Sequence, residues 1–409
     1  MARVTALLTM LIAGAPAHSS ERIYDVLYEV RVVPERVGAE VTLRLTQPRA
    51  YARRFTFRID PDRQHGFAGD GALKQSGATI TWLPPERGGK LSWFASLESE
   101  RKNDAYDGVV TADWAVFRGD DLVPPAKLLK LERAKSRSRL LFRLPKGWSS
   151  ITPYARSDEG ADEVVHADRS FDRPTGWMAL GRLGVLWGTA AQTRLAVAGP
   201  VDVGLRHQDI LAFLRWTVPA LRATFPAFTP RLLVVGAGDP MWRGGLSAPA
   251  SVFLHAARPL ISENGTSTLL HELVHVAMRL RAQRGCDWIV EGFAELYSLE
   301  FLLRSGTISS RHYREALELL GEWGKDVDDL FTRHSRGAQT ARGVIVLKAL
   351  DEEIRARSGG TRSLDDLARE LADSGTVSFA DLRARAERLA GGGPVKALSS
   401  AKVPGAPRA

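Results

Sequence analysis

Cysteine is nearly absent from this sequence. Only Cys286 occurs among the 409 residues, so no intramolecular disulfide can form and a cysteine-based zinc cluster is excluded. The sequence also lacks lysine-rich blocks and the regular alternation of aromatic and basic residues that lines a nucleic-acid groove. Scattered arginines supply most of the basic excess behind the net charge of +9, which favours a solvated basic surface, with an acidic partner as the alternative. We therefore expect no nucleic acid among the partners.

Apolar runs long enough to span a membrane are lacking as well. A bilayer-spanning helix needs about 20 apolar residues, whereas the apolar run from Val4 to Ala13 has ten. With Arg3 before it and Ala15-Pro16-Ala17 after it, this run predicts a secretory signal cleaved after Ala17; the alternative is a buried first strand. A cysteine-poor exported protein fits a bacterial periplasm, or secretion. No stable membrane insertion is expected after cleavage.

Residues 22–198 have the pattern of a β-rich domain. Glu40–Leu45 and Arg54–Ile59 alternate with period two, as half-buried strands do. Shorter runs of the same kind follow, separated by clusters of Gly, Pro, Asp and Asn. Short strands with this spacing predict a β-sandwich or a saddle-shaped sheet. The fold class expected for the whole chain is α+β.

The pattern changes after Gly199-Pro200, where we place a domain boundary. The second domain, residues 200–390, begins with helical spacing over Gln208–Thr224 and two buried strands, and is then mostly helical. Residues 391–409 are rich in Gly, Pro, Ala and Ser, a composition that predicts a disordered tail.

Helix starts and stops can be located in the second domain. Thr266 or Ser267 can cap a helix that runs to about Arg284, with Gly285 as its stop and Asp287 opening the next helix. Two later segments resemble capping boxes, which join a Ser at the cap to an acidic residue three positions on. These segments are Ser363–Asp366 and Ser378–Asp381.

The first of these helices carries a metal-binding pattern. His271 and His275 are four residues apart and lie on one helix face, so both imidazoles can point at one ion. Glu272, beside the first histidine, can take a proton from a water molecule at that ion, as in the H-E-x-x-H pattern of zinc peptidases. A catalytic zinc needs a third protein ligand and one open position.

The next helix supplies candidates for the remaining roles. Glu291 and Glu295 lie four apart among apolar neighbours, where an unpaired carboxylate would be costly. We assign Glu291 as the third ligand. We assign Glu295 as the acceptor for the free ring nitrogen of a histidine ligand, expected to be His271. The alternative is a solvated helix face with a chance motif.

These residues resemble the gluzincin metallopeptidases, most of all the glycyl-aminopeptidase family and more distantly the alanyl-aminopeptidase family. The shared signature is H-E-x-x-H followed by E-G-F-x-E, here His271–His275 and Glu291–Glu295. Leu144–Trp148 resembles a strand end of the family, and Gly244-Gly245-Leu246 resembles its substrate strand. The resemblance implies an N-terminal β domain, a thermolysin-like, mainly helical catalytic domain, one zinc ion, and substrate binding at Gly244 and Gly245.

The sequence departs from the family pattern at several points. The spacing between His275 and Glu291 is shorter, and the PDZ domain common in glycyl aminopeptidases is missing. Ser247 stands where the family has a glutamate that holds the substrate's amine, and Thr340 stands where it has a tyrosine that stabilises the oxyanion. The residues that could replace that tyrosine are His312, Tyr313 and His334.

The sequence therefore predicts an exported zinc metallopeptidase, exo- or endo-acting and possibly an aminopeptidase, that acts on a peptide or protein substrate. One alternative is a metal-binding protein of the same fold that has lost catalysis and serves as a binding or assembly factor. A second alternative is a β-rich adhesion or scaffold protein that carries the motif by chance.

Overall fold

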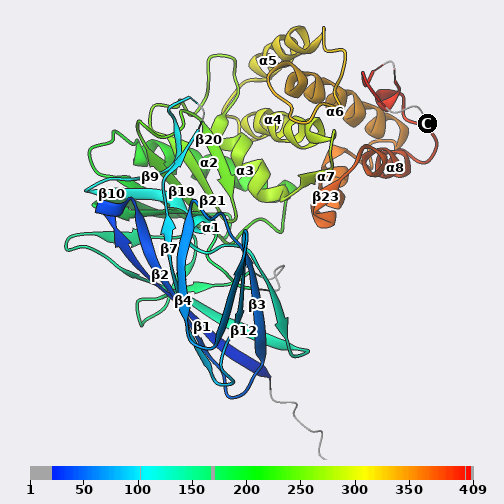
Figure 1. Ribbon diagram of the computed structural model, residues 1–409. Helices are drawn as coiled ribbons and strands as arrows, with labels where there is room; N and C mark the ends of the chain where they lie inside the picture. Colours follow the sequence, from blue (N-terminus) through cyan, green and yellow to red (C-terminus); the bar gives the residue numbers. More distant parts are fainter. Residues whose placement is uncertain (1–20, 102, 167–170, 401, 407–409) are drawn as a thin grey trace, which may run out of the picture.

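The strands of the N-terminal half show the alternation that their sequence predicts. The computed structural model describes residues 21–101, 103–166, 171–400 and 402–406 (Figure 1). In β1 (Arg22–Val33), the side chains of Tyr24, Val26, Tyr28 and Val30 are buried, and those between them are partly exposed. One face of each such strand therefore packs on a core while the other meets solvent. The predicted signal sequence at 1–17 lies outside the described residues.

Two sheets enclose the first hydrophobic core. We name them the outer sheet and the cover sheet. The outer sheet runs, in spatial order, β14 (Ala155–Arg156), β15 (Asp162–Val164), β12 (Ala134–Arg143), β1, β2 (Gly38–Thr46), β7 (Gly88–Ser96) and β4 (Gln64–Gly69). The cover sheet runs β11 (Ala126–Lys130), β3 (Ala52–Arg58), β6 (Thr79–Leu83) and β5 (Ala72–Ser76). Phe55 and Phe57 of β3 pack with Tyr28 and Leu43 between the two sheets.

Two further sheets meet face to face in the middle of the molecule. The bridging sheet runs β13 (Ser149–Ile151), β16 (Trp177–Gly181), β10 (Trp114–Arg118), β9 (Tyr106–Val110) and β8 (Ser99–Glu100). The helix-backed sheet runs β17 (Leu183–Ala190), β18 (Thr193–Pro200), β19 (Arg231–Ala237), β21 (Ser251–His255) and β20 (Gly245–Ala248). Trp177 and Phe253 join the two sheets, with ring centroids 5.1 Å apart.

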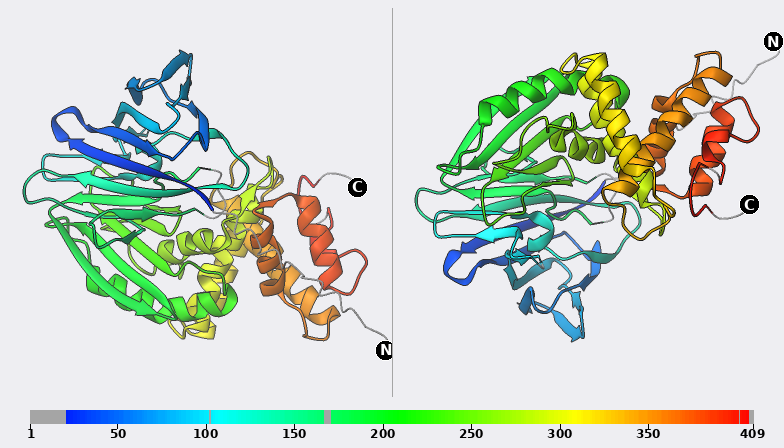
Figure 2. Two further views of the ribbon diagram at one scale, coloured as in Figure 1. Left: turned by 90° about the horizontal axis from the view of Figure 1, so that it is seen from below. Right: turned by 90° about the horizontal axis from the view of Figure 1, so that it is seen from above.

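Helices cover the other face of the helix-backed sheet and continue to the C-terminus. They are α2 (His207–Thr224), α3 (Thr268–Met278), α4 (Asp287–Arg304), α5 (Ser310–Gly324), α6 (Ala338–Arg357), α7 (Leu364–Ser374) and α8 (Phe379–Leu389). Short elements complete the chain: η1 (Pro34–Arg36), α1 (Gly119–Leu122), β22 (Arg281–Ala282), β23 (Thr376–Val377) and η2 (Lys396–Leu398). Figure 2 shows the sheets stacked beside α2, with the C-terminal helices at one end of the stack. Within the described ranges, no helix is both long and apolar enough to cross a membrane.

The structure corrects the predicted domain boundary. We expected the N-terminal domain to end at 198, before Gly199-Pro200. Instead β18 pairs in parallel with β19, and β17 pairs with β18. Both strands therefore belong to the helix-backed sheet, so the change from one unit to the next falls near Arg182, which lies between β16 and β17. The alternating pattern of a strand does not show which sheet it joins.

The length of α3 and the state of the tail also differ from expectation. The helix ends at Met278 rather than near Arg284, because β22 leaves it to pair with β23. The described part of the tail, residues 391–400 and 402–406, is packed instead of disordered: Leu398 and Val403 are buried in the helical core. The carboxylate of Glu353 accepts the backbone N–H groups of residues 396 and 397. A composition rich in small residues therefore did not prevent docking.

Candidate metal centre

The position of helix α3, which carries His271 and His275, is fixed by a cap at its start and by a buried face. The Ser267 hydroxyl accepts the backbone N–H of Leu270, so the helix begins where the cap was predicted. Leu269 and Leu273 are fully buried in the helical core, which they share with Leu254 of β21. His271 lies between these anchors and contacts Glu291 and Glu295 of α4, with which α3 packs closely.

The helix α4 is more deeply buried than α3. The Asp287 carboxylate accepts the backbone N–H of Ser335, which ties the start of the helix to the segment before α6. Trp288 and Phe293 have no exposed surface. Glu291 and Glu295 lie one turn apart on the side that faces α3, as their contacts with His271 show. This helix therefore brings two carboxylates into a setting from which water is largely removed.

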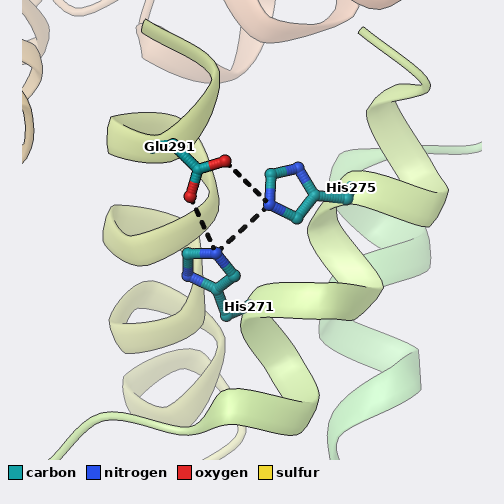
Figure 3. A group of neighbouring side chains, drawn as sticks. All are labelled: His271, His275 and Glu291. Atoms are coloured by element: carbon teal, nitrogen blue, oxygen red, sulfur yellow. Dashed lines mark hydrogen bonds and ion pairs between the residues drawn. The ribbon is translucent and has the colours of Figure 1, made fainter. Parts of the chain in front are cut away.

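Three side chains converge between the two helices (Figure 3). The Nε2 atoms of His271 and His275 are 3.2 Å apart. One carboxylate oxygen of Glu291 lies 3.3 Å from Nε2 of His271, and the other lies 3.6 Å from Nε2 of His275. The side chains are 17%, 18% and 27% exposed, in the order His271, His275, Glu291, so each keeps only a minor part of its surface in contact with solvent.

This triangle fits a zinc ion. Zinc binds nitrogen and oxygen at about 2.0–2.2 Å in a tetrahedron, so neighbouring ligand atoms lie about 3.3 Å apart. The separation of the two Nε2 atoms and the distance from each of them to its nearer Glu291 oxygen are close to that length. Two neutral imidazoles and a carboxylate also form a donor set that favours zinc over calcium or magnesium. The fourth corner of the tetrahedron has no ligand among these three residues, which is the arrangement of a catalytic site.

Glu295 holds the first histidine from behind. Its carboxylate lies 2.8 Å from Nδ1 of His271, which leaves Nε2 of that ring for the ion. Burial lowers the pKa of His271, but the bonds with Glu291 and Glu295 outweigh burial and raise it well above its ordinary value. Burial and the neighbouring His271 lower the pKa of His275. The structure thus places Glu295 where the sequence predicted a partner for a ligand histidine.

Glu272 lies against the edge strand of the helix-backed sheet. Any Cβ at Gly245 would come within 2.8 Å of Cγ of Glu272 and within 2.8 Å of Cγ2 of Thr268. Only a glycine permits this approach of β20 to α3. Glu272 also acts electrostatically on both His271 and His275. The residue predicted as the base therefore lies between the metal ligands and the strand predicted to bind substrate.

The strand β20 presents backbone groups beside this glutamate. It is the last strand of its sheet in the described structure and pairs with β21. His255 N donates to Gly244 O, so even-numbered residues of β20 face β21 and the backbone groups of Gly245 and Ser247 point outward. The other predicted substrate residue, Gly244, lies against the indole of Trp242 rather than against the metal ligands.

The residues considered as replacements for the missing oxyanion tyrosine are placed differently. Tyr313 is buried and its hydroxyl donates to Glu300 on the far part of α4. His312 lies against the loop before α3, near Gly265, and His334 is exposed. Thr340 lies in the first turn of α6. The contacts recorded for these four residues do not include the metal ligands.

A polar cluster behind the ligand helix was not anticipated from the sequence. The buried Tyr297 hydroxyl donates to Asp365 of α7, and Arg304 pairs with both Asp365 and Glu300. These contacts fix the second half of α4 against the C-terminal helices. Asp365 lies more than 60 positions from both Tyr297 and Arg304, so periodicity within a helix gives no sign of these two contacts.

The fold is similar to those of several solved structures. An aminopeptidase N family protein from Idiomarina loihiensis matches with a TM-score of 0.62 and 14% identity, over 85% of this chain and 70% of that one. A mutant M1 zinc metallopeptidase from Deinococcus radiodurans matches with a TM-score of 0.59 and 13% identity, over 94% of both chains. Native yeast LTA4 hydrolase matches with a TM-score of 0.53 and 14% identity, over 94% of this chain and 68% of that one.

Comparisons of sequence give no match. A scan against protein-family models finds none, and neither does a search of curated proteins. The likeness at 13–14% identity therefore establishes an M1-like fold of mixed helices and sheets.

Proposed function

We propose that this protein is a zinc-dependent metallopeptidase with His271, His275 and Glu291 as ligands and Glu272 as general base. The observation that carries the proposal is the meeting of the two Nε2 atoms, 3.2 Å apart, with the two carboxylate oxygens of Glu291, which lie 3.3 Å from one nitrogen and 3.6 Å from the other. These separations are close to the distance between neighbouring ligand atoms around one zinc ion. The M1-like fold supports the proposal because its solved examples are described as zinc metallopeptidases.

The side chains of the site suggest how a peptide bond would be cleaved. A zinc ion held by the three ligands would polarise the scissile carbonyl and lower the pKa of a water molecule toward about 7. Glu272 accepts the proton of the attacking water and later delivers it to the leaving amine. Glu295 keeps Nε2 of His271 directed at the ion through its contact with Nδ1.

An extended peptide is the substrate that fits β20. The outward backbone groups of Gly245 and Ser247 can pair with a substrate backbone in the manner of an added strand. Such pairing would set the peptide alongside Glu272, which contacts the same strand. An aminopeptidase of the thermolysin-like kind, nearest to the glycyl-aminopeptidase family, is the finer form of this proposal, and it rests on the sequence motifs.

The site of action is part of the proposal. The signal pattern at residues 1–17 supports export to the periplasm or beyond. The gene product would be located by cell fractionation. A periplasmic protein that begins at His18, after cleavage at Ala17, would support this location. Retention of residues 1–17 in a cytoplasmic product would contradict it.

A second candidate is a metal-binding protein of the same fold that has lost catalysis. The hydrogen bond from the Tyr313 hydroxyl to Glu300 favours this candidate. Because that hydroxyl is already engaged, Tyr313 does not replace the tyrosine that the resemblance leads us to expect at Thr340 as the oxyanion donor. The two candidates are separated by peptide hydrolysis in a mixed library by the zinc-loaded protein. Hydrolysis that disappears in Glu272→Gln supports the peptidase, whereas full zinc occupancy without hydrolysis supports the binding protein.

A further inference from the structure

Two arginines face one another at the start of β18 and β19 in the helix-backed sheet. Arg194 of β18 and Arg231 of β19 are direct partners in the parallel register of these strands. Neighbouring strands lie about 4.8 Å apart. Both residues lie on the face that meets the bridging sheet, since Ala196 and Leu233, two positions further along each strand, belong to that core. The two guanidinium groups therefore start from adjacent points on one surface.

Like charges in this register oppose folding unless something neutralises them. The guanidinium of Arg231 donates to the backbone carbonyl of Tyr154 at 3.2 Å. Burial and the nearby Arg194 lower the pKa of Arg231, which shows that the two charges act on each other. Among the described residues, neither guanidinium forms an ion pair with a carboxylate.

The nearest carboxylate is already engaged. Asp162 is almost fully buried and acts on Arg231 electrostatically. Its two oxygens, however, accept hydrogen bonds from Arg156 and Thr152. Among the residues that the structure describes here, three arginines against one carboxylate leave two positive charges in excess.

The surroundings form a shallow hollow between the two halves of the molecule. Arg194 and Arg231 line it together with Thr152 and Pro153. Trp187 of β17 forms one wall, is 48% exposed, and has the guanidinium of Arg194 stacked over its ring at 4.6 Å. The hollow thus combines fixed positive charge, an aromatic surface and access from solvent.

We propose that Arg194 and Arg231 form a binding site for a phosphoryl dianion, either free phosphate or an aromatic phosphomonoester. A dianion matches the two excess charges, whereas a carboxylate would neutralise half of them. Guanidinium groups bind phosphate oxygens through paired, charge-assisted hydrogen bonds. The exposed indole of Trp187 offers a stacking surface for an aromatic group attached to the phosphate. This site does not depend on the proposed peptidase activity.

The first test is calorimetric titration of the full chain with inorganic phosphate at low ionic strength. Saturable binding that weakens at least about tenfold in both Arg194→Gln and Arg231→Gln supports the site, since each change removes charged hydrogen bonds. Arg231→Lys keeps the charge and is expected to retain part of the affinity. The matched control is Arg53→Gln, which removes the same charge from an exposed position on β3.

Other outcomes would overturn the proposal. These are no saturable binding, unchanged affinity in both glutamine variants, or an equal loss in Arg53→Gln, which would indicate attraction to the overall basic surface. Circular dichroism shows whether each variant is folded. Titration with phenyl phosphate then identifies which of the two ligands the site binds. If phenyl phosphate binds more tightly than inorganic phosphate, and Trp187→Ala removes the difference, the ligand is an aromatic ester. If the two bind equally, the ligand is free phosphate.

Discussion

The contact between Gly245 and Glu272 gives the sharpest prediction of the structure. In Gly245→Ala, the new Cβ would lie 2.8 Å from Cγ of Glu272 and 2.8 Å from Cγ2 of Thr268. Carbon atoms pack at about 3.5–4.0 Å, so Glu272 must move by about 0.7–1.2 Å. A misplacement of about 1 Å in a reacting group can lower the rate roughly 100-fold. We therefore expect kcat to fall by about that factor.

The zinc content of Gly245→Ala should equal that of the parent protein. The atoms nearest to the new methyl group belong to Glu272 and Thr268, and not to His271, His275 or Glu291. The stability cost of overpacking is expected at about 1–3 kcal/mol, which thermal unfolding measures. The assay is hydrolysis of fluorogenic peptides beside zinc determination by mass spectrometry. The matched control is Gly238→Ala, because the closest atom to its new Cβ lies at 3.8 Å.

Three results would refute this reasoning. Full activity in Gly245→Ala would show that Glu272 does not rest against β20 during catalysis. Loss of zinc in the same variant would show that the strand acts on the ligands rather than on the base. Equal loss of activity in Gly238→Ala would show that any change in the segment from Gly238 to Gly245 disturbs the site, so the effect would not be specific to the contact with Glu272.

Further predictions concern the ligands, the tail and the oxyanion. Glu295→Gln should weaken zinc binding about 10–100-fold in competition with a chelator, because His271 loses its charged partner; unchanged affinity would contradict that role. Zinc affinity should fall as the pH decreases from about 7 to about 4.5, because histidine ligands must be neutral and the raised pKa of His271 lets protons compete from higher pH; a flat curve would contradict the ligand set. Glu353→Ala should expose the C-terminal tail to limited proteolysis and cost about 1–3 kcal/mol in unfolding free energy; a tail that stays resistant would show that other contacts hold it. Tyr313→Phe should keep its kcat because the hydroxyl serves Glu300; a large loss would make it the oxyanion donor.

Features set by neighbours in sequence were well predicted. The capping boxes at Ser363–Asp366 and Ser378–Asp381 form as expected, because each depends on four consecutive residues. The same holds for the cap at Ser267 and for the alternating strands of the N-terminal half. The meeting of His271, His275 and Glu291 could be inferred because helix periodicity and the apolar neighbours of Glu291 limit where these groups can point.

Features that depend on distant partners were not predicted. The end of α3 at Met278 follows from the pairing of β22 with β23, which lies about 95 positions further along the chain. The docking of the tail depends on Glu353, and the membership of β18 depends on β19. The facing arginines Arg194 and Arg231 become neighbours only through that same strand pairing. Local pattern carries no information about such register.

The most direct test of the central claim compares the mature protein with its Glu272→Gln variant. Zinc content and peptide hydrolysis are measured on the same preparations. The account predicts one zinc ion in each protein and hydrolysis by the parent alone, since the ligands remain and the base is lost. Absence of zinc from the parent, or equal hydrolysis by both proteins, would contradict it.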